Sequence, residues 1–220
     1  MQYLIQVANK SHFKYAQSIC IMMEKAAQVR GTGIARRDPD YIMQKMREHK
    51  AIIALDDDKV IGFCYIESWE DEKYVANSGL IIHPAYRKQG LAKALKKETF
   101  VLSAKMFPKS KLFGITTSMA VMKINSELGY KPVTFSELTQ DEKFWNGCQS
   151  CTNYDILLRT QKQMCICTGM VYDFNSTPND LINKNTAWNK FKEFMQVRKK
   201  RILELTKQLP TIQKLYQNEK

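Results

Sequence analysis

The sequence contains no apolar run long enough to cross a lipid bilayer, and residues 1–10 lack the layout of a secretory signal peptide. It also contains no internal repeat and no low-complexity tract. These absences argue against a membrane-spanning helix and a repeat architecture, so we expect a soluble, cytoplasmic protein. Thiols stay reduced in the cytoplasm, and the six cysteines are therefore expected to be free rather than paired in disulfides.

The composition favours a folded domain with a basic appendage. The chain has 220 residues, 44% of them hydrophobic, with ten Phe and ten Tyr, which is enough to bury a sizeable core. Its net charge of +12 is unevenly placed, because residues 181–220 hold ten Lys and Arg against three Glu. We therefore predict a mildly basic domain over residues 1–175 and a basic, amphipathic helical tail over residues 176–220.

Hydrophobic periodicity predicts alternating strands and helices along the first domain. Asp38 or Asp40 is a candidate N-cap for one of the helices, and the turn of a first hairpin falls at residues 56–59. The order of elements predicts an α/β (α+β) fold. The predicted strands are residues 3–8, the hairpin 51–69, 74–84, 111–118 and a second hairpin over 152–172; the predicted helices begin near residues 12, 40, 91 and 119.

The stretch from His83 to Lys97 joins a strand to a helix through a glycine turn. Such a join leaves several backbone N–H groups unpaired at the positive end of the helix dipole, where they can bind phosphate oxygens. Gly90 and Ala92 are small, which allows a ligand to approach the backbone closely. The pattern indicates a phosphate-bearing ligand, attracted by the nearby cations Arg87, Lys88, Lys93, Lys96 and Lys97.

The hexapeptide R-K-Q-G-L-A at residues 87–92, preceded by L-I-I-H-P-A-Y, resembles the signature of the GNAT superfamily of acyl-CoA N-acyltransferases. The resemblance covers residues 3–172 and implies a mixed, mostly antiparallel sheet flanked by helices. It further implies that the strand backbone around Leu80 and Ile82 pairs with the pantetheine arm of acetyl-CoA or another acyl-CoA. The backbone N–H groups implied to bind the pyrophosphate are those of Arg87, Lys88, Gln89, Gly90, Leu91 and Ala92.

Four further stretches are similar to a group of stand-alone Bacteroidetes acetyltransferases, some of which are associated with arginine biosynthesis. These stretches are R-G-T-G-I-A, G-F-C-Y-I-E-S-W, K-L-F-G-I-T-T and F-W-N-G-C-Q-S-C.

Acyl transfer to an amine needs a base, an oxyanion site and a proton for the leaving thiolate. In the resembled family a tyrosine four residues before a Gly-aromatic pair often donates that proton, and here Asn125 stands before Gly129 and Tyr130. Asparagine is no general acid, although its amide can bind the cofactor. Tyr130, Tyr65 or a water remains open as the acid, as does departure of the thiolate unaided. Glu67 is the candidate base, on the same strand face as Tyr65; an ordinary exposed carboxylate is the alternative.

The nonapeptide at residues 29–37 lies where the resembled family shapes its acceptor pocket. Arginine forks match carboxylates, so Arg30, Arg36 and Arg37, together with Thr32, are candidate substrate-binding residues. The alternative is a helix that ends at Gly31, followed by solvated arginines.

Two cysteine pairs, Cys148 with Cys151 and Cys165 with Cys167, are the candidate metal ligands. Tetrathiolate zinc is the functional alternative, but the C-x-C pair is atypical of zinc sites and falls in a predicted strand. We expect packed free thiols and no metal.

These observations predict an N-acyltransferase that moves an acetyl or other short acyl group from acyl-CoA to a primary amine of a small molecule. Glutamate or another acidic amino acid is the leading acceptor. Two alternatives stay open: a catalytically weak acyl-CoA-binding regulator, favoured by Asn125, and acetylation of a protein partner, favoured by the basic tail. The apolar face of the tail is expected to pack on the domain or form a homodimer, with no nucleic-acid or membrane partner.

Overall fold

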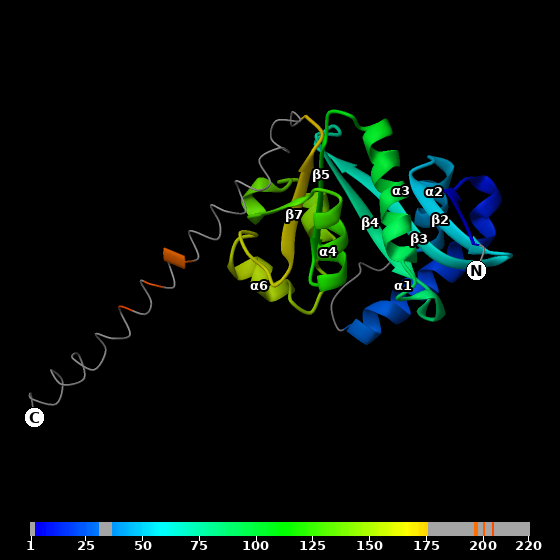
Figure 1. Cartoon of the computed structure of the whole chain (residues 1–220), viewed down its shortest axis with the longest axis horizontal. Helices are drawn as coiled ribbons and strands as arrows, with labels where there is room; N and C mark the ends of the chain where they lie inside the picture. The colour runs from blue at the N-terminus through cyan, green and yellow to red at the C-terminus, as the bar shows by residue number, and fades with distance from the viewer. Residues whose placement is uncertain (1–2, 31–36, 176–195, 198–199, 201–203, 205–220) are drawn as a thin grey trace, which may run out of the picture. The chain divides into compact units, whose positions relative to one another are not determined.

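A seven-stranded sheet is the framework of the computed structural model, which describes residues 3–30, 37–175, 196–197, 200 and 204 (Figure 1). The strand order is β1-β2-β3-β4-β5-β7-β6, and each neighbouring pair is antiparallel except β4 and β5, which are parallel. The predicted mixed, mostly antiparallel sheet is thereby confirmed. The strands are β1 Leu4–Val7, β2 Ala51–Asp56, β3 Lys59–Trp69, β4 Tyr74–Ile82, β5 Lys111–Thr116, β6 Lys131–Val133 and β7 Thr168–Asp173.

Helices flank the sheet and begin where the sequence supplies caps. The Asp38 side chain accepts a hydrogen bond of 2.8 Å from the Tyr41 N–H, so Asp38 rather than Asp40 caps the second helix. The α-helices are α1 Ala16–Arg30, α2 Pro39–Arg47, α3 Leu91–Met106, α4 Met119–Glu127, α5 Glu142–Asn146 and α6 Tyr154–Arg159. The 3-10 turns are η1 Lys10–Tyr15, η2 Pro84–Tyr86 and η3 Phe135–Glu137. Within the described residues, none of the helices has the length and apolar character needed to cross a membrane.

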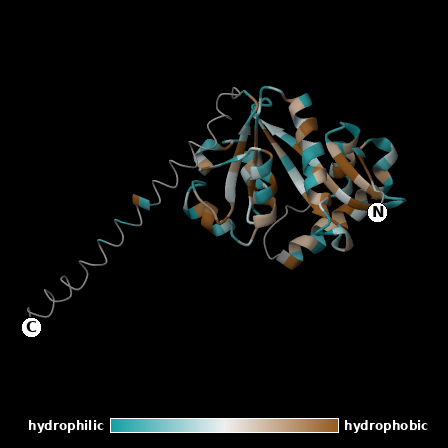
Figure 2. Cartoon of the chain, in the orientation of Figure 1, coloured by the Kyte–Doolittle hydropathy of each residue, from teal (hydrophilic) through white to brown (hydrophobic). Residues whose placement is uncertain are grey.

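Alternation along β3 assigns the two faces of the sheet. Phe63 and Tyr65 belong to the core that α1 and α2 cover, while Cys64 packs on the opposite face with Leu91 and Leu95 of α3. Both faces are therefore buried, and hydrophobic residues run along the strands and the inner sides of the helices (Figure 2). The segment between β6 and β7 covers the face of Tyr65 farther along the sheet, over β4 and β5.

A β-bulge interrupts the pairing of β3 and β4. Phe63 is opposite Ile81 and Tyr65 is opposite Ser78, which leaves Gly79 and Leu80 facing the single residue Cys64. Gly79 has a φ of 63°, and a Cβ at this position would lie 2.2 Å from Cε1 of the Tyr65 ring. Only glycine fits this conformation and this space.

Strands β4 and β5 separate soon after they meet. Their parallel register spans only Tyr74–Ala76 against Lys111–Phe113, although β5 continues to Thr116 beside β7. Beyond Ala76, this edge of β4 therefore has no strand neighbour in the described part of the chain. The sheet is split between β4 and β5 on the side where both strands end.

The second predicted hairpin is wrong in its first half. Residues 154–159 form α6 rather than a strand, and β7 begins only at Thr168. Consequently Cys165 and Cys167 precede the strand that was expected to contain them. In this short segment helical and alternating patterns look alike, and burial of Leu157 against the neighbouring core favours the helix.

The sequence also did not predict β6, α5 or the 3-10 turns η2 and η3. The chain divides into a unit of residues 1–175 and a second of residues 176–220; the site described below belongs to the first. The predicted helical tail lies outside the described residues, apart from four positions.

Candidate active site

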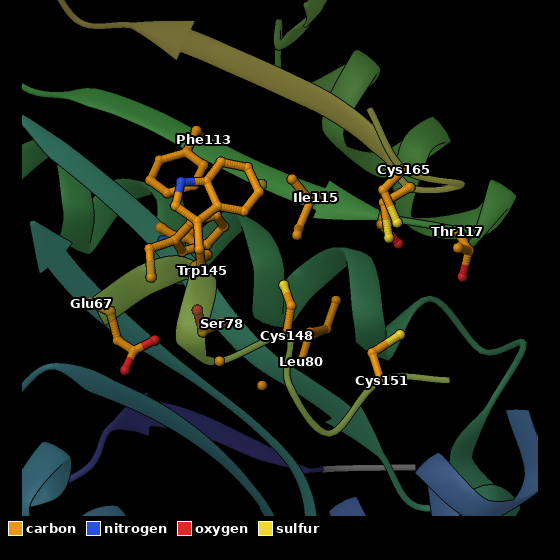
Figure 3. Close-up of a pocket in the computed structure, with 18 of the residues that line it drawn as sticks. Glu67, Ser78, Leu80, Phe113, Ile115, Thr117, Trp145, Cys148, Cys151 and Cys165 are labelled. Carbon is orange, nitrogen blue, oxygen red and sulfur yellow. The ribbon is translucent and has the colours of Figure 1, made fainter. Parts of the chain in front are cut away.

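A cavity of about 390 Å³ lies over the split, on the sheet face that carries Tyr65 (Figure 3). Residues 76–80 of β4 and 113–116 of β5 line it from the two sides of the split. β3 contributes Tyr65, Glu67 and Trp69, and the segment between β6 and β7 closes the remaining wall. The cavity therefore opens onto the unpaired edge of β4.

Glu67 carries the only carboxylate among the described lining residues, and its side chain is 15% exposed. Burial raises the pKa of this carboxyl group, while the Arg37 guanidinium and a hydrogen bond with Ser78 oppose the shift. Arg37 Nη2 lies 3.9 Å from Glu67 Oε2. A carboxylate with a raised pKa inside a cavity is suited to accept a proton near neutral pH.

Tyr65 lies beside Glu67, as the strand alternation predicted. Its hydroxyl oxygen accepts a hydrogen bond of 3.0 Å from Nε of Arg37, and its ring packs edge-on against Tyr41 at 5.8 Å. Burial raises the pKa of Tyr65, so its hydroxyl stays protonated at neutral pH. Arg37, Tyr65 and Glu67 thus form one connected group, which we term the charged wall of the cavity.

The bulge places main-chain groups at the cavity surface. Gly79 and Leu80 both line the cavity and have no partner in the register with β3. An extended ligand can add to an unpaired strand edge through main-chain hydrogen bonds. Of the two residues expected to meet pantetheine, Leu80 lines the cavity, whereas Ile82 pairs with Gly62 and its carbonyl accepts a 3.2 Å bond from Nε of Arg87.

The turn before α3 presents backbone donors to an open space. Gly90 is the N-cap with a φ of 83°, it has no side-chain cap bond, and a Cβ there would meet nothing within 4 Å. The first backbone bond of the helix runs from the Ala94 N–H to the Gly90 carbonyl at 3.1 Å. Within the described chain the N–H groups of residues 90–93 have no acceptor, as expected for a helix start. This turn fits a phosphate group.

Two side chains stabilise the same turn through hydrogen bonds to its backbone. Arg87 Nε bonds the Ile82 carbonyl, and Gln89 Nε2 bonds the Ala85 carbonyl at 3.1 Å. The Arg87 N–H bonds the Pro84 carbonyl at 3.3 Å, so the unpaired donors begin nearer Gly90 than the hexapeptide alone implied. Leu91 is buried and anchors the helix on the sheet, while Lys88 is exposed with a φ of 62°.

Asn125 and Tyr130 lie behind the cavity rather than in its lining. Asn125 is 2% exposed; its Nδ2 approaches Met170 Sδ at 3.8 Å, and its Oδ1 has no partner among the described residues. Tyr130 is 3% exposed, and burial raises its pKa well above 10. Its hydroxyl lies 3.4 Å from Oδ1 of Asn77, a cavity-lining residue, so Tyr130 is one side chain away from the cavity.

The acceptor candidates are only partly described. Arg37 lies in the cavity wall, but Thr32, Arg36 and the side chain of Arg30 fall outside the described residues. Lys143 of α5 is a second cation in the lining. Sequence reasoning missed it, because the segment that carries it was not predicted to reach the site.

Cys148, Cys151, Cys165 and Cys167 all line the cavity as free thiols. Burial, reinforced by neighbouring thiols, raises the pKa of Cys148 to about 11 and that of Cys167 to about 12. Among residues 3–30 and 37–175, no group of three or more His, Cys, Asp or Glu is arranged to hold a metal ion. The Cys148 and Cys167 thiols are therefore neutral at neutral pH and contribute an apolar surface.

Sequence reasoning also missed Gly79 and the aromatic residues of the segment between β6 and β7. A glycine inside a strand pattern is the usual signal of a bulge, and Gly79 showed that signal. Phe135, Phe144 and Trp145 offered no signal, because their place over the split depends on how a long connection folds back.

Comparison with known families and structures accords with this geometry. Residues 19–103 match the family model described as Acetyltransferase (GNAT) family. A search of curated proteins finds no significant match.

Three solved structures share the fold at low identity. An N-acetylglutamate synthase from Neisseria gonorrhoeae, complexed with coenzyme A and N-acetyl-glutamate, aligns with a TM-score of 0.57 and 14% identity over 80% of this chain and 36% of that chain. Rv2747 from Mycobacterium tuberculosis, in complex with CoA and NLQ, aligns with a TM-score of 0.55 and 13% identity over 77% of this chain and 98% of that chain. Diaminobutyrate acetyltransferase EctA from Paenibacillus lautus, in complex with L-2,4-diaminobutyric acid and coenzyme A, aligns with a TM-score of 0.54 and 9% identity. The alignment covers 80% of this chain and 98% of that chain.

This chain thus spans about a third of the length of the Neisseria synthase. The family match covers β3, β4 and the turn before α3, which include Glu67, the bulge and the phosphate-fitting turn. The structural matches extend the likeness over most of the first unit. Residues 19–103 of this chain are thus similar to the acetyltransferase (GNAT) family, and the solved structures show that the chain shares their fold.

Proposed function

We propose that this protein transfers a short acyl group from acyl-CoA to the amine of a small molecule, with glutamate or another acidic amino acid as the leading acceptor. The observation that carries the proposal is the continuity of three features. The unpaired edge of β4 leads from the phosphate-fitting turn, past the bulge at Gly79, to the partly buried carboxylate of Glu67. An acyl-CoA donor and an amine acceptor need these features in this order.

The donor would bind along β4. Its pyrophosphate would accept hydrogen bonds from the N–H groups at the start of α3, where the helix dipole also favours negative charge. Its pantetheine arm would lie along the edge of β4 beyond Ala76, which places the thioester near Gly79 and Leu80. Main-chain N–H groups at the bulge are candidates to stabilise the oxyanion of the tetrahedral intermediate.

Glu67 would remove a proton from the acceptor ammonium, directly or through a water. The free amine would then attack the thioester carbonyl and form the C–N bond of a tetrahedral intermediate. This intermediate would lose its second amine proton to solvent and expel the thiolate as the C–S bond breaks. Because burial raises the pKa of Glu67, the carboxylate binds that proton more readily than an exposed glutamate does. The Arg37 guanidinium keeps the carboxyl group ionised enough to act as a base.

The leaving thiolate would end as a thiol. A thiol of ordinary pKa, about 8.5, needs little assistance to leave near neutral pH. Tyr130 could supply a proton only through Asn77 or a water, because its hydroxyl lies outside the cavity lining. Departure of the thiolate with a solvent proton therefore agrees best with the position of Tyr130.

Charges in the cavity wall support an acidic acceptor. Arg37 and Lys143 both line the cavity with Glu67, so two cations accompany one carboxylate. A dicarboxylic amino acid could place its amine at Glu67 and one carboxylate at each cation, through charge-assisted hydrogen bonds. The Neisseria synthase is described with N-acetyl-glutamate in its structure, which is consistent with this acceptor class.

An acceptor screen that follows release of free CoA tests the proposal. Glutamate or a close relative should be acylated with a higher kcat/KM than any cationic amine. Arg37→Ala and Lys143→Ala should raise the KM for that acceptor far more than the KM for acyl-CoA. Arg159→Ala is the matched control, because Arg159 is exposed and does not line the cavity. A cationic best acceptor would refute the acidic assignment.

A second candidate function is acyl-CoA binding without efficient turnover. The buried positions of Asn125 and Tyr130 favour it, since neither supplies an acid to the cavity lining. The same screen separates the two functions. Tight CoA binding with no acceptor-dependent CoA release would support the binding protein.

A further inference from the structure

The cavity has two walls of different chemistry, and Trp69 of β3, whose ring packs against Phe113 at 5.5 Å, lies where they meet. In the cross-strand register, Glu67 of β3 is opposite Ala76 of β4, and Ala76 is opposite Phe113 of β5. The three side chains therefore lie in a row on one face of the sheet. The charged wall stands on the β3 side of this row, and an aromatic residue stands on the β5 side.

We define the apolar wall as six of the cavity-lining residues that come from β5 and from the segment between β6 and β7. Aromatic rings pack closely within it: Phe113 and Phe144 have centroids 4.9 Å apart, and Phe144 and Trp145 have centroids 4.8 Å apart. Lys143 from the same segment is exposed and therefore belongs to the mouth of the cavity. The apolar wall consists of Phe113, Ile115, Phe144, Trp145, Cys148 and Cys165.

Cysteine side chains extend this wall. Figure 3 shows Cys148 and Cys165 on the cavity surface together with Ile115 and Trp145. Thiol groups and aromatic rings can bury hydrocarbon, but they give a carboxylate no compensating partner. The apolar wall is therefore unsuited to the carboxylates of an acidic acceptor.

The position of the split decides which substrate meets the apolar wall. The split lies between β4 and β5, so a group delivered through it emerges beside Ile115 and Phe113. Glu67 and Arg37 lie on the other side of β4, over β3. The acceptor amine belongs at Glu67, and the acyl group of the donor comes through the split.

We propose that the apolar wall is an acyl-chain subsite and that the preferred donor carries an aliphatic acyl group longer than acetyl, of about four to six carbons. This inference rests on the proposed function, because it assigns the donor of that same site. An acetyl group exposes one methyl to the wall, whereas the cavity volume of about 390 Å³ is in the range of small-molecule sites. Each further buried methylene should improve binding about fourfold.

A donor series on the full-length protein tests the subsite. Acetyl-, butyryl-, hexanoyl- and decanoyl-CoA would be compared by calorimetry without acceptor, and by CoA release with the best acceptor. We expect hexanoyl-CoA to bind at least about tenfold more tightly than acetyl-CoA, and its kcat/KM to be higher by a similar factor. Equal or weaker binding of hexanoyl-CoA would overturn the subsite.

Two substitutions reduce the space beside the apolar wall, each from a different element. If one variant misfolds, the other still tests the inference. Ile115→Phe fills the wall from β5, and Cys148→Phe fills it from the connection after α5. Each should lower the ratio of hexanoyl-CoA to acetyl-CoA affinity at least about tenfold. Val101→Phe is the control, because Val101 is 53% exposed on α3, and it should leave the ratio unchanged.

The two arms separate failure of this inference from failure of the proposed function. If both narrowing variants fold and keep the wild-type affinity ratio, the longer chain binds elsewhere and the inference is wrong. If transfer proceeds best from acetyl-CoA, the acyltransferase stands and the subsite falls. If hexanoyl-CoA binds tightly and both variants abolish that preference, the subsite holds even where no acceptor releases CoA.

Discussion

Gly79 and Gly90 both have positive φ angles but lie in opposite surroundings. A Cβ at Gly79 would lie 2.2 Å from the Tyr65 ring, whereas a Cβ at Gly90 would meet nothing within 4 Å. Gly79→Ala should therefore lower the free energy of unfolding by at least about 1 kcal/mol more than Gly90→Ala, since only Gly79→Ala adds a clash to the backbone strain. Urea unfolding of the two variants measures the difference. Equal losses of unfolding free energy in the two variants would show that the bulge accommodates the added methyl group without destabilising the protein.

Gly90 should matter for the cofactor rather than for stability. Gly90→Leu should weaken CoA binding at least ~10-fold, a loss of ~1.4 kcal/mol, because its side chain would enter the open space in front of the helix N-terminus. Gly90→Asn is the matched variant, since asparagine tolerates the left-handed conformation better than other non-glycine residues. Calorimetry with CoA measures both. Wild-type affinity in Gly90→Leu would remove the turn from the binding site.

Glu67 should control the acidic limb of the pH–rate profile. Its raised pKa means that the carboxylate gains a proton, and the enzyme loses its base, at a higher pH than an exposed glutamate would. The rate should therefore fall as the pH drops through that raised pKa. Glu67→Gln should lower kcat by ~10²–10⁴-fold and remove this limb, with Glu72→Gln as the exposed control. An unchanged profile in Glu67→Gln would exclude Glu67 as the base.

At this scale the sequence predicted the arrangements that depend on local order. The turn before α3 and the alternation of Tyr65 with Glu67 follow from spacing within one strand or one join. The bulge at Gly79 depends instead on which residue of β3 faces it, and the place of Lys143 depends on a distant connection. Such pairings are tertiary, so a single sequence does not reveal them.

Among the elements, the connection between β6 and β7 forms much of the cavity wall. This connection packs around one tryptophan. Trp145 is 2% exposed, its Nε1 donates a 2.9 Å bond to the Thr139 carbonyl, and its ring packs against Phe135 at 5.6 Å. Trp145→Ala should therefore cost about 3–5 kcal/mol of unfolding free energy, and Trp145→Phe clearly less. Urea unfolding with both variants checks this. Similar losses would indicate that the indole hydrogen bond, rather than packing, holds the connection.

The elements that the sequence predicted correctly are those with long, regular patterns. The hairpin of β2 and β3 and the amphipathic helix α3 combine clear periodicity with a turn or cap. The short helices α5 and α6 have five and six residues, too few for periodicity to distinguish helix from strand. Their conformation is set by the core they cover, where Leu157 and Trp145 are buried together.

For the whole molecule, we expect donor binding not to need the basic tail. The described site lies entirely within residues 1–175, where the turn before α3, the split and the charged wall are found. Removing residues 181–220 should therefore leave the CoA affinity within about threefold of the full chain, although it lowers the net charge of +12 by seven. Calorimetry on a folded truncation tests this. A large loss of CoA affinity would show that the tail completes the site.

The short parallel pairing of β4 with β5 divides the sheet into two parts, which we call its leaves, joined along only a few residues. Three residue pairs connect β1–β4 to β5, β7 and β6, and beyond them the leaves diverge. A donor lying along β4 would act as an inserted eighth strand and tie the leaves together. Donor binding would then also stiffen the sheet, because it would pair the edge of β4 that β5 leaves unpaired beyond Ala76.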